Sequence, residues 1–134
     1  MITEDYVSFE IAKLLREKGF KEEYCYEYYD RNYELKHCKN IINNAVIDDG
    51  FPSEALSVAP THQMALKWLR EVHNIYIDIE TCYIYYNNKE NFEVTGLAYC
   101  IHTEEDPCYE DTDNFDTYEE AVEAACLYVL KNLI

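Results

Sequence analysis

The stretch that decides the fold runs IYIDIETCYIYYNNKENFEVTGLAYCI, residues 75–101. In its first part, Ile75, Ile77 and Ile79 alternate with polar and aromatic residues, which is typical of a strand with one buried face. After the turn-forming residues 87–89, apolar residues alternate again up to Ile101. The stretch therefore predicts an antiparallel β-hairpin.

The alternation in the second half of this hairpin slips by one residue at Gly96. The apolar positions are Phe92 and Val94 before the slip and Leu97, Tyr99 and Ile101 after it. A β-bulge inserts one extra residue into a strand and so changes the face to which later residues point. We therefore predict a bulge here, with a weakly formed strand end as the alternative.

A first helix and a shorter hairpin are predicted upstream. Residues 8–18 carry apolar side chains at helical spacing, with Ser8 as the N-cap. Gly19 can adopt the left-handed conformation that ends a helix, and Phe20 then falls where a Schellman motif places an apolar contact onto the preceding turn. Residues 24–36 follow as tyrosine-rich strands around a turn at residues 30–32, which predicts a hairpin.

A second helix is predicted between the two hairpins. Pro60 suits its first position and Asn74 its left-handed end. Its apolar residues at helical spacing are Ala65, Trp68, Leu69 and Val72. Residues 37–59, which precede it, follow neither period, so we expect a short helix or a functional loop there.

A third helix closes the chain. It opens with a capping box, either at Thr117 and Glu120 or one residue earlier at Asp116 and Glu119. Its predicted inner residues are Tyr118, Ala121, Val122, Ala125, Val129 and Leu133, and we expect Cys126 to lie in the core beside them.

Residues 1–134 are therefore expected to form a single α+β domain with the order helix-hairpin-helix-hairpin-helix and an antiparallel sheet packed against three helices. Two pairs of fragments within it look alike: KLLRE (13–17) with KWLRE (67–71), and CYEYYD (25–30) with CYIYYN (82–87). They indicate a duplicated αββ unit. Coincidence is the alternative, because Lys, Leu, Arg and Glu are common helix formers.

The charge is strongly negative and unevenly distributed. The formal net charge is −16, of which −5 falls on residues 1–89 and −11 on residues 90–134. Nucleic acids and anionic membranes attract Lys and Arg, so direct binding to either is disfavoured. We instead expect a protein partner with a basic surface.

Most of this charge lies between Glu104 and Glu120, where nine of seventeen residues are acidic. The carboxylates nearest the third helix favour its N-terminus, which accounts for part of the run. The others are candidate partner-binding residues: Glu104, Glu105, Asp106, Glu110, Asp111 and Asp113. An alternative is that they mimic the phosphates of DNA and inhibit a nucleic-acid-binding enzyme. The fourteen tyrosines suit contact surfaces as well as sheet packing.

No catalytic residues or cofactors are predicted. Glycine occurs only at positions 19, 50 and 96, which excludes the glycine-rich loops that bind nucleotide phosphates. Cys100, His102 and Cys108 are weak candidates for a metal site without an evident fourth ligand, and buried structural side chains are the alternative. An unrecognised metal-dependent or thiol hydrolase, built on these residues or on residues 37–59, is the third functional alternative.

The start of the chain carries neither a basic segment nor an apolar signal core. We therefore expect a cytoplasmic protein whose six cysteines are reduced.

Three segments resemble a family of small proteins of uncharacterised function that phages, prophages and mobile elements of gut bacteria encode. They are SFEIAKLLREKGF (8–20), APT (59–61) continuing to KWLREVHNI (67–75), and YEEA (118–121), and they touch all three predicted helices. The resemblance implies no activity, cofactor or catalytic residue. It implies a non-enzymatic accessory protein in the cytoplasm of the bacterial host, acting on host or phage machinery through protein contacts.

Overall fold

The computed structural model describes residues 2–21, 27–37, 56–86, 91–106, 109–110 and 114–134. It confirms the α+β class. The helices are α1 (Phe9–Glu17), α2 (His62–His73) and α3 (Tyr118–Asn132), and the strands are β1 (Glu27–Tyr29), β2 (Leu35–His37), β3 (Ser57–Val58), β4 (Tyr76–Tyr86), β5 (Asn91–His102) and β6 (Tyr109–Glu110). No helix in the described ranges is long and apolar enough to cross a membrane.

The described strands form two separate antiparallel sheets, with the orders β2-β1-β3 and β4-β5-β6. The prediction of one sheet made from two plain hairpins is therefore wrong. Each hairpin gains a third strand, β3 or β6, and each of these is only two residues long. Such short strands carry no detectable alternation, because a period of two needs about four residues to show. The rest of the segment predicted as a helix or loop, residues 38–55, lies outside the described residues.

The two sheets differ in topology. The central strand is β1, the first strand of its hairpin, in one sheet, and β5, the second strand of its hairpin, in the other. A simple duplication would place equivalent strands at the centre of both. The duplicated αββ unit therefore stays a prediction without support from the strand order.

The helix ends follow the local signals closely. Ser8 and Thr117 are N-caps whose hydroxyls accept from the amides of Ile11 and Glu120, 3.4 and 3.1 Å away. Gly19 has a φ of 98° and Asn74 a φ of 54°, which confirms both left-handed ends. The Phe20 amide donates to the Leu15 carbonyl at 2.9 Å, as a Schellman motif requires.

Three positions were predicted wrongly. The second helix begins at His62 after the N-cap Thr61, so Pro60 precedes it by two residues, because the Thr61 hydroxyl caps the Met64 amide. Tyr118 and Leu133 were expected to face inward, but both are exposed, as is Val72 of the second helix. Tyr118 and Leu133 lie at the two ends of α3 and Val72 near the end of α2, where helical periodicity continues past the neighbouring elements that cover the rest of the face.

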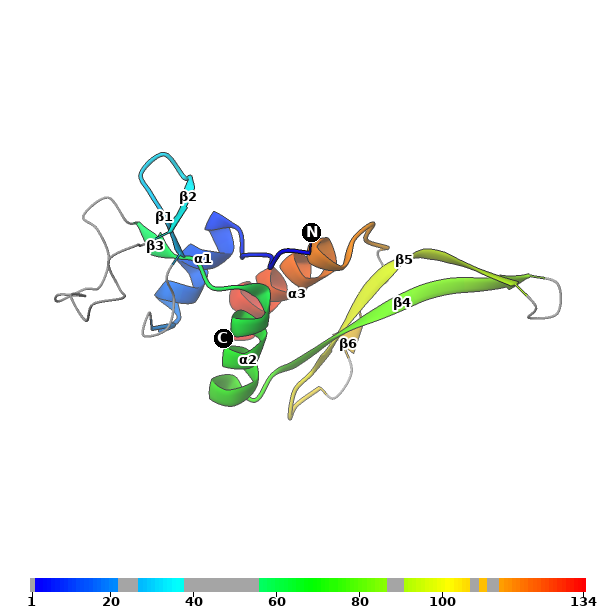
Figure 1. Cartoon of the computed structure of the whole chain (residues 1–134). Helices are drawn as coiled ribbons and strands as arrows, with labels where there is room; N and C mark the ends of the chain where they lie inside the picture. The colour runs from blue at the N-terminus through cyan, green and yellow to red at the C-terminus, as the bar shows by residue number, and fades with distance from the viewer. Residues whose placement is uncertain (1, 22–26, 38–55, 87–90, 107–108, 111–113) are drawn as a thin grey trace.

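Helix α3 is the centre of the core. It packs against α1, α2, β4 and β5, as the red helix in the middle of Figure 1 shows. The largest side chains that are fully buried around it include Ile11, Leu15, Leu69, Ile101, Val122, Val129 and Leu130. Cys126 is buried among them as expected, and its burial raises the pKa of its thiol to about 12.

The predicted bulge is confirmed. Cys82 pairs with Gly96, but Tyr83 pairs with Val94, so Thr95 is the extra residue. Because of the bulge, the apolar residues before and after it in β5 share one face of the hairpin with alternate residues of β4. The cross-strand pairs on that face are Ile77 with Ile101, Ile79 with Tyr99, Thr81 with Leu97, Tyr83 with Val94 and Tyr85 with Phe92.

The bulge lies where the segment before α3 crosses β5, and Gly96 has no room for a side chain there. A Cβ added to it would lie 2.8 Å from the Cβ of Asn114 and 3.2 Å from the carbonyl oxygen of Phe115. We expect Gly96→Ala to lower the free energy of unfolding by about 2 kcal/mol in urea denaturation, because this contact must widen. Thr95→Ala, at the exposed bulge residue, is the control, and equal stability of the two variants would contradict the contact.

Candidate functional site

The hairpin of β4 and β5 extends well beyond the helices (Figure 1). We call residues 76–81 and 97–102 its root, and residues 82–86 and 91–95 the arm. The apolar face of the cross-strand pairs runs through both parts without interruption. The root and the arm therefore share one apolar face, and they differ in what covers that face.

At the root, α3 covers the apolar face. Ile101 is completely buried and Tyr99 is 3% exposed, and both belong to the main hydrophobic core. In the arm, Tyr85 is 53% and Phe92 65% exposed on the same face. Large apolar side chains that gather in a contiguous exposed patch commonly mark a protein-interaction site.

The aromatic rings of the arm contact one another. The ring of Tyr83 lies 5.1 Å from that of Tyr85 and 6.1 Å from that of Phe92, in edge-to-face geometry. A hydrogen bond with Tyr83 raises the pKa of the Tyr85 hydroxyl. Val94, also exposed, completes the cluster. Because these rings support one another, the patch is partly ordered before any partner binds.

The opposite face of the same hairpin carries its carboxylates, together with the exposed side chains of Tyr76 and Ile84. It carries Asp78 and Glu80 on β4 and Glu93 on β5, and neither strand contains a Lys or an Arg. His102 Nε2 lies 2.9 Å from an oxygen of Asp78, so one of these carboxylates has a hydrogen-bond partner at the root. The hairpin thus has one apolar and aromatic face and one face that carries its carboxylates, two of them at the root and one, Glu93, in the arm.

The predicted partner-binding residues Glu104, Glu105 and Asp106 lie in the exposed turn that follows β5. The carbonyl of Asp106 accepts from the amide of Thr103 at 2.9 Å, which closes the turn. One oxygen of Glu104 accepts from the side-chain amide of Asn74 at 2.9 Å. The three residues are exposed, and the turn holds them next to the end of α2.

The described part of the acidic run does not lie on one face. Glu104 and Glu105 line a cavity with the last residues of the chain, beyond the end of α3, whereas Glu119 lies in the first turn of that helix. A helix of this length separates its ends by about 22 Å. The side chain of Glu110 and the whole of Asp111 and Asp113 lie outside the described residues. The described carboxylates give no support to a continuous DNA-like surface.

Two of the three metal-ligand candidates, Cys100 and His102, lie among the described residues. Cys100 is buried, and His102 lies two residues further along β5 with Asp78 as its hydrogen-bond partner. Cys108 lies outside the described residues. Within the described ranges, no three His, Cys, Asp or Glu side chains are placed to hold a metal ion.

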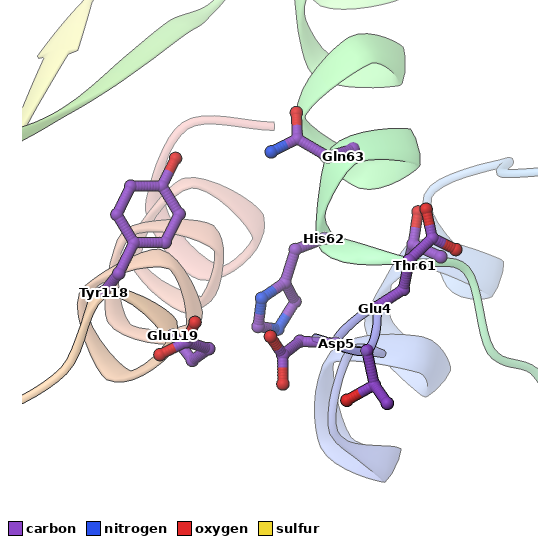
Figure 2. Close-up of a pocket in the computed structure, with 8 residues that line it drawn as sticks. Glu4, Asp5, Thr61, His62, Gln63, Tyr118 and Glu119 are labelled. Atoms are coloured by element: carbon purple, nitrogen blue, oxygen red, sulfur yellow. The ribbon is translucent and has the colours of Figure 1, made fainter. Parts of the chain in front are cut away.

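A small pocket of about 210 Å³ lies between the N-terminal segment and the first turns of α2 and α3 (Figure 2). Its charged groups are the carboxylates of Glu4, Asp5 and Glu119, and the ring of His62 lies between α3 and the N-terminal segment. Among the described residues that line it there is no Ser or Cys, the commonest nucleophiles.

His62 is part of a buried joint rather than an open catalytic group. Its Nε2 lies 2.8 Å from Oε1 of Glu123, and the same oxygen accepts from the amide of Ser8 at 2.9 Å. Ser8 caps α1, His62 begins α2 and Glu123 lies in α3. One carboxylate therefore connects all three helices.

The two hydrogen bonds that Glu123 accepts should contribute to the stability of the folded protein. We expect Glu123→Ala to lower the free energy of unfolding by about 2 kcal/mol, because it removes the acceptor of two donors, one of them on a buried ring. Glu123→Gln keeps an acceptor oxygen and is expected to cost less. Glu119→Ala, on the same helix, is the control in urea denaturation. A loss no larger for Glu123→Ala than for Glu119→Ala would show that the joint contributes little.

Comparison of the chain with models of protein families, with curated proteins and with solved structures finds no match. Sequence reasoning missed the joint between His62 and Glu123, because these residues are far apart and neither lies in a recognisable motif. It identified the alternation of the arm but not its exposure.

Proposed function

We propose that the protein is a non-enzymatic protein-binding module whose aromatic arm is the main contact surface. The observation that carries the proposal is the change of surroundings along one apolar face, which is core at the root and exposed in the arm. Two-stranded ribbons are marginal in water unless something packs against them. A partner that covers the arm would supply this packing.

The composition of the arm supports a protein as the partner. Tyrosine and phenylalanine are enriched in protein interfaces, where they bury a large area at a small entropic cost. The acidic opposite face and the net charge of −16 disfavour DNA, RNA and anionic lipid. The turn at Glu104 to Asp106 adds carboxylates that favour a partner with a basic rim.

The sequence is the basis for the cellular context that we propose for this function. The resemblance to phage- and prophage-encoded proteins favours a regulatory accessory role in the bacterial cytoplasm, through contact with a host or phage protein. The alternatives of a DNA mimic and of a hydrolase have weaker support. The described carboxylates are divided between two places, and no three His, Cys, Asp or Glu side chains among the described residues are placed to hold a metal ion.

The proposal is tested by comparing proteins captured from native-host lysate by the wild-type chain and two double variants. Tyr85→Ser with Phe92→Ser changes the arm, and Tyr118→Ser with Val72→Ser removes exposed apolar groups from the helices. We expect at least one protein to be captured by the wild type and the helix variant but not by the arm variant. Identical captures by all three chains would overturn the proposal.

A further inference from the structure

We propose that the partner contributes an extended strand, with apolar and basic side chains in alternation, which adds to the free edge of β4. This inference rests on the proposed function and states the chemistry of its partner. It follows from three features of β4: a long edge, two unlike faces and an acidic charge.

The edge of β4 is long and unpaired in the described structure. β4 is eleven residues long, lies at the end of the order β4-β5-β6 and is hydrogen-bonded to β5 alone among the described strands. In an antiparallel pair, every second residue directs its N–H and C=O away from the neighbouring strand. β4 therefore presents a row of backbone donors and acceptors to which another strand can pair.

The edge carries only part of the usual protection against such pairing. Natural edge strands are commonly blocked by charged side chains, especially lysine, by proline or by a bulge that turns the edge away. The charged residues of β4 are Asp78 and Glu80, which repel an acidic strand but attract a basic one. β4 contains no Lys or Pro, and the bulge of this hairpin is in β5. The absence of these features on an edge of this length favours a strand partner rather than a partner that contacts the face alone.

The two faces of β4 specify which side chains that strand must carry. On one face, Ile79, Tyr83 and Tyr85 continue the apolar surface from the root into the arm. On the other face, Asp78 and Glu80 are acidic at the root, and Ile84 is exposed in the arm. A strand added beside β4 places its alternate residues on the same two faces. Apolar residues would pack beside the tyrosines, and Lys or Arg would lie beside the carboxylates.

The same charges disfavour a second copy of this chain as the added strand. A second β4 would bring its own Asp78 and Glu80 to the acidic face and a net charge of −16 to the complex. Like charges on neighbouring strands are destabilising, whereas a basic strand gains from the same field. We therefore assign the edge to a different protein.

Synthetic eleven-residue peptides are the probes. The first alternates Tyr or Ile with Lys, the second replaces Lys by Glu, and the third has the composition of the first at helical spacing. The dissociation constant and hydrogen exchange of β4 backbone amides are measured with the intact protein by NMR. We expect the first peptide to bind at least tenfold more tightly than the others and to protect the outward amides of β4.

Two matched changes separate strand addition from simple charge attraction. N-methylation of one set of alternate peptide residues should abolish binding, while methylation of the other set should be tolerated, because only one set faces β4. Asp78→Asn with Glu80→Gln should lower the affinity for the basic peptide at least tenfold and reduce its dependence on salt. The reference is Glu4→Gln with Glu119→Gln, which removes as many charges beside His62.

The outcomes distinguish this inference from the proposed function. Equal binding of all three peptides, or β4 amides that stay unprotected, would overturn strand addition. If the arm variant still lost its captured protein, the proposed function would stand. A dimer in sedimentation, with β4 amides protected in the absence of peptide, would show that a second copy occupies the edge and would also overturn the inference.

Discussion

Replacing Tyr85 and Phe92 together by serine is expected to weaken binding to the captured partner at least a hundredfold. Aromatic residues at the centre of an interface commonly contribute 2 kcal/mol or more each, and about 2.7 kcal/mol in total already corresponds to a hundredfold. Both side chains are exposed and neither belongs to the main core, so the fold should remain. Isothermal titration calorimetry with the purified partner measures the change.

The helix variant, Tyr118→Ser with Val72→Ser, is the control for this measurement and should bind within about threefold of the wild type, because scattered exposed residues rarely matter for binding. Circular dichroism should give the same spectrum for both variants. An arm variant that binds like the wild type would place the interface elsewhere. The turn of Glu104, Glu105 and Asp106 would then be the next surface to change.

A second expected result contrasts the two ends of the apolar face. Ile101→Ala at the root is expected to lower the free energy of unfolding by about 3 kcal/mol, because the residue is completely buried and the substitution leaves a cavity. Val94→Ala in the arm, on the same face of the same strand, is expected to change it by less than about 0.5 kcal/mol. Urea denaturation of both variants provides the values.

The difference between the two losses of stability tests the packing of the hairpin rather than the proposed function. If Val94→Ala cost as much as Ile101→Ala, the arm would be packed within the protein itself and would not be free to bind.

Addition of a saturating partner should raise the stability of the wild-type chain, because a ligand that binds the folded state stabilises it. The Tyr85 and Phe92 double variant should not show this increase at the same partner concentration.

Local features of the fold could be predicted from the sequence because their causes are local. The slip at Gly96 identified the bulge to within one residue, since alternation of side chains directly reports the facing of a strand. Ser8, Gly19 and Asn74 fixed helix ends through side-chain capping or left-handed backbone. These interactions join residues at most a few positions apart.

Features that depend on distant residues could not be predicted. The alternation of Tyr83 and Tyr85 shows that they share a face, but it does not show whether a helix covers that face. The joint of His62 with Glu123 joins residues of two different helices. The acidic run was identified, yet its division between the turn at Glu104 and the start of α3 depends on how β5, β6 and α3 pack.

Photo-crosslinking in living cells tests the account most directly. The photoreactive amino acid p-benzoyl-phenylalanine is placed at Phe92 in the arm or, as a control, at Tyr118 on α3; both positions are exposed. The account predicts one dominant protein adduct from the arm position and little or none from the helix position. Adducts from Tyr118 alone, or none from either position in cells that contain the captured partner, would contradict it.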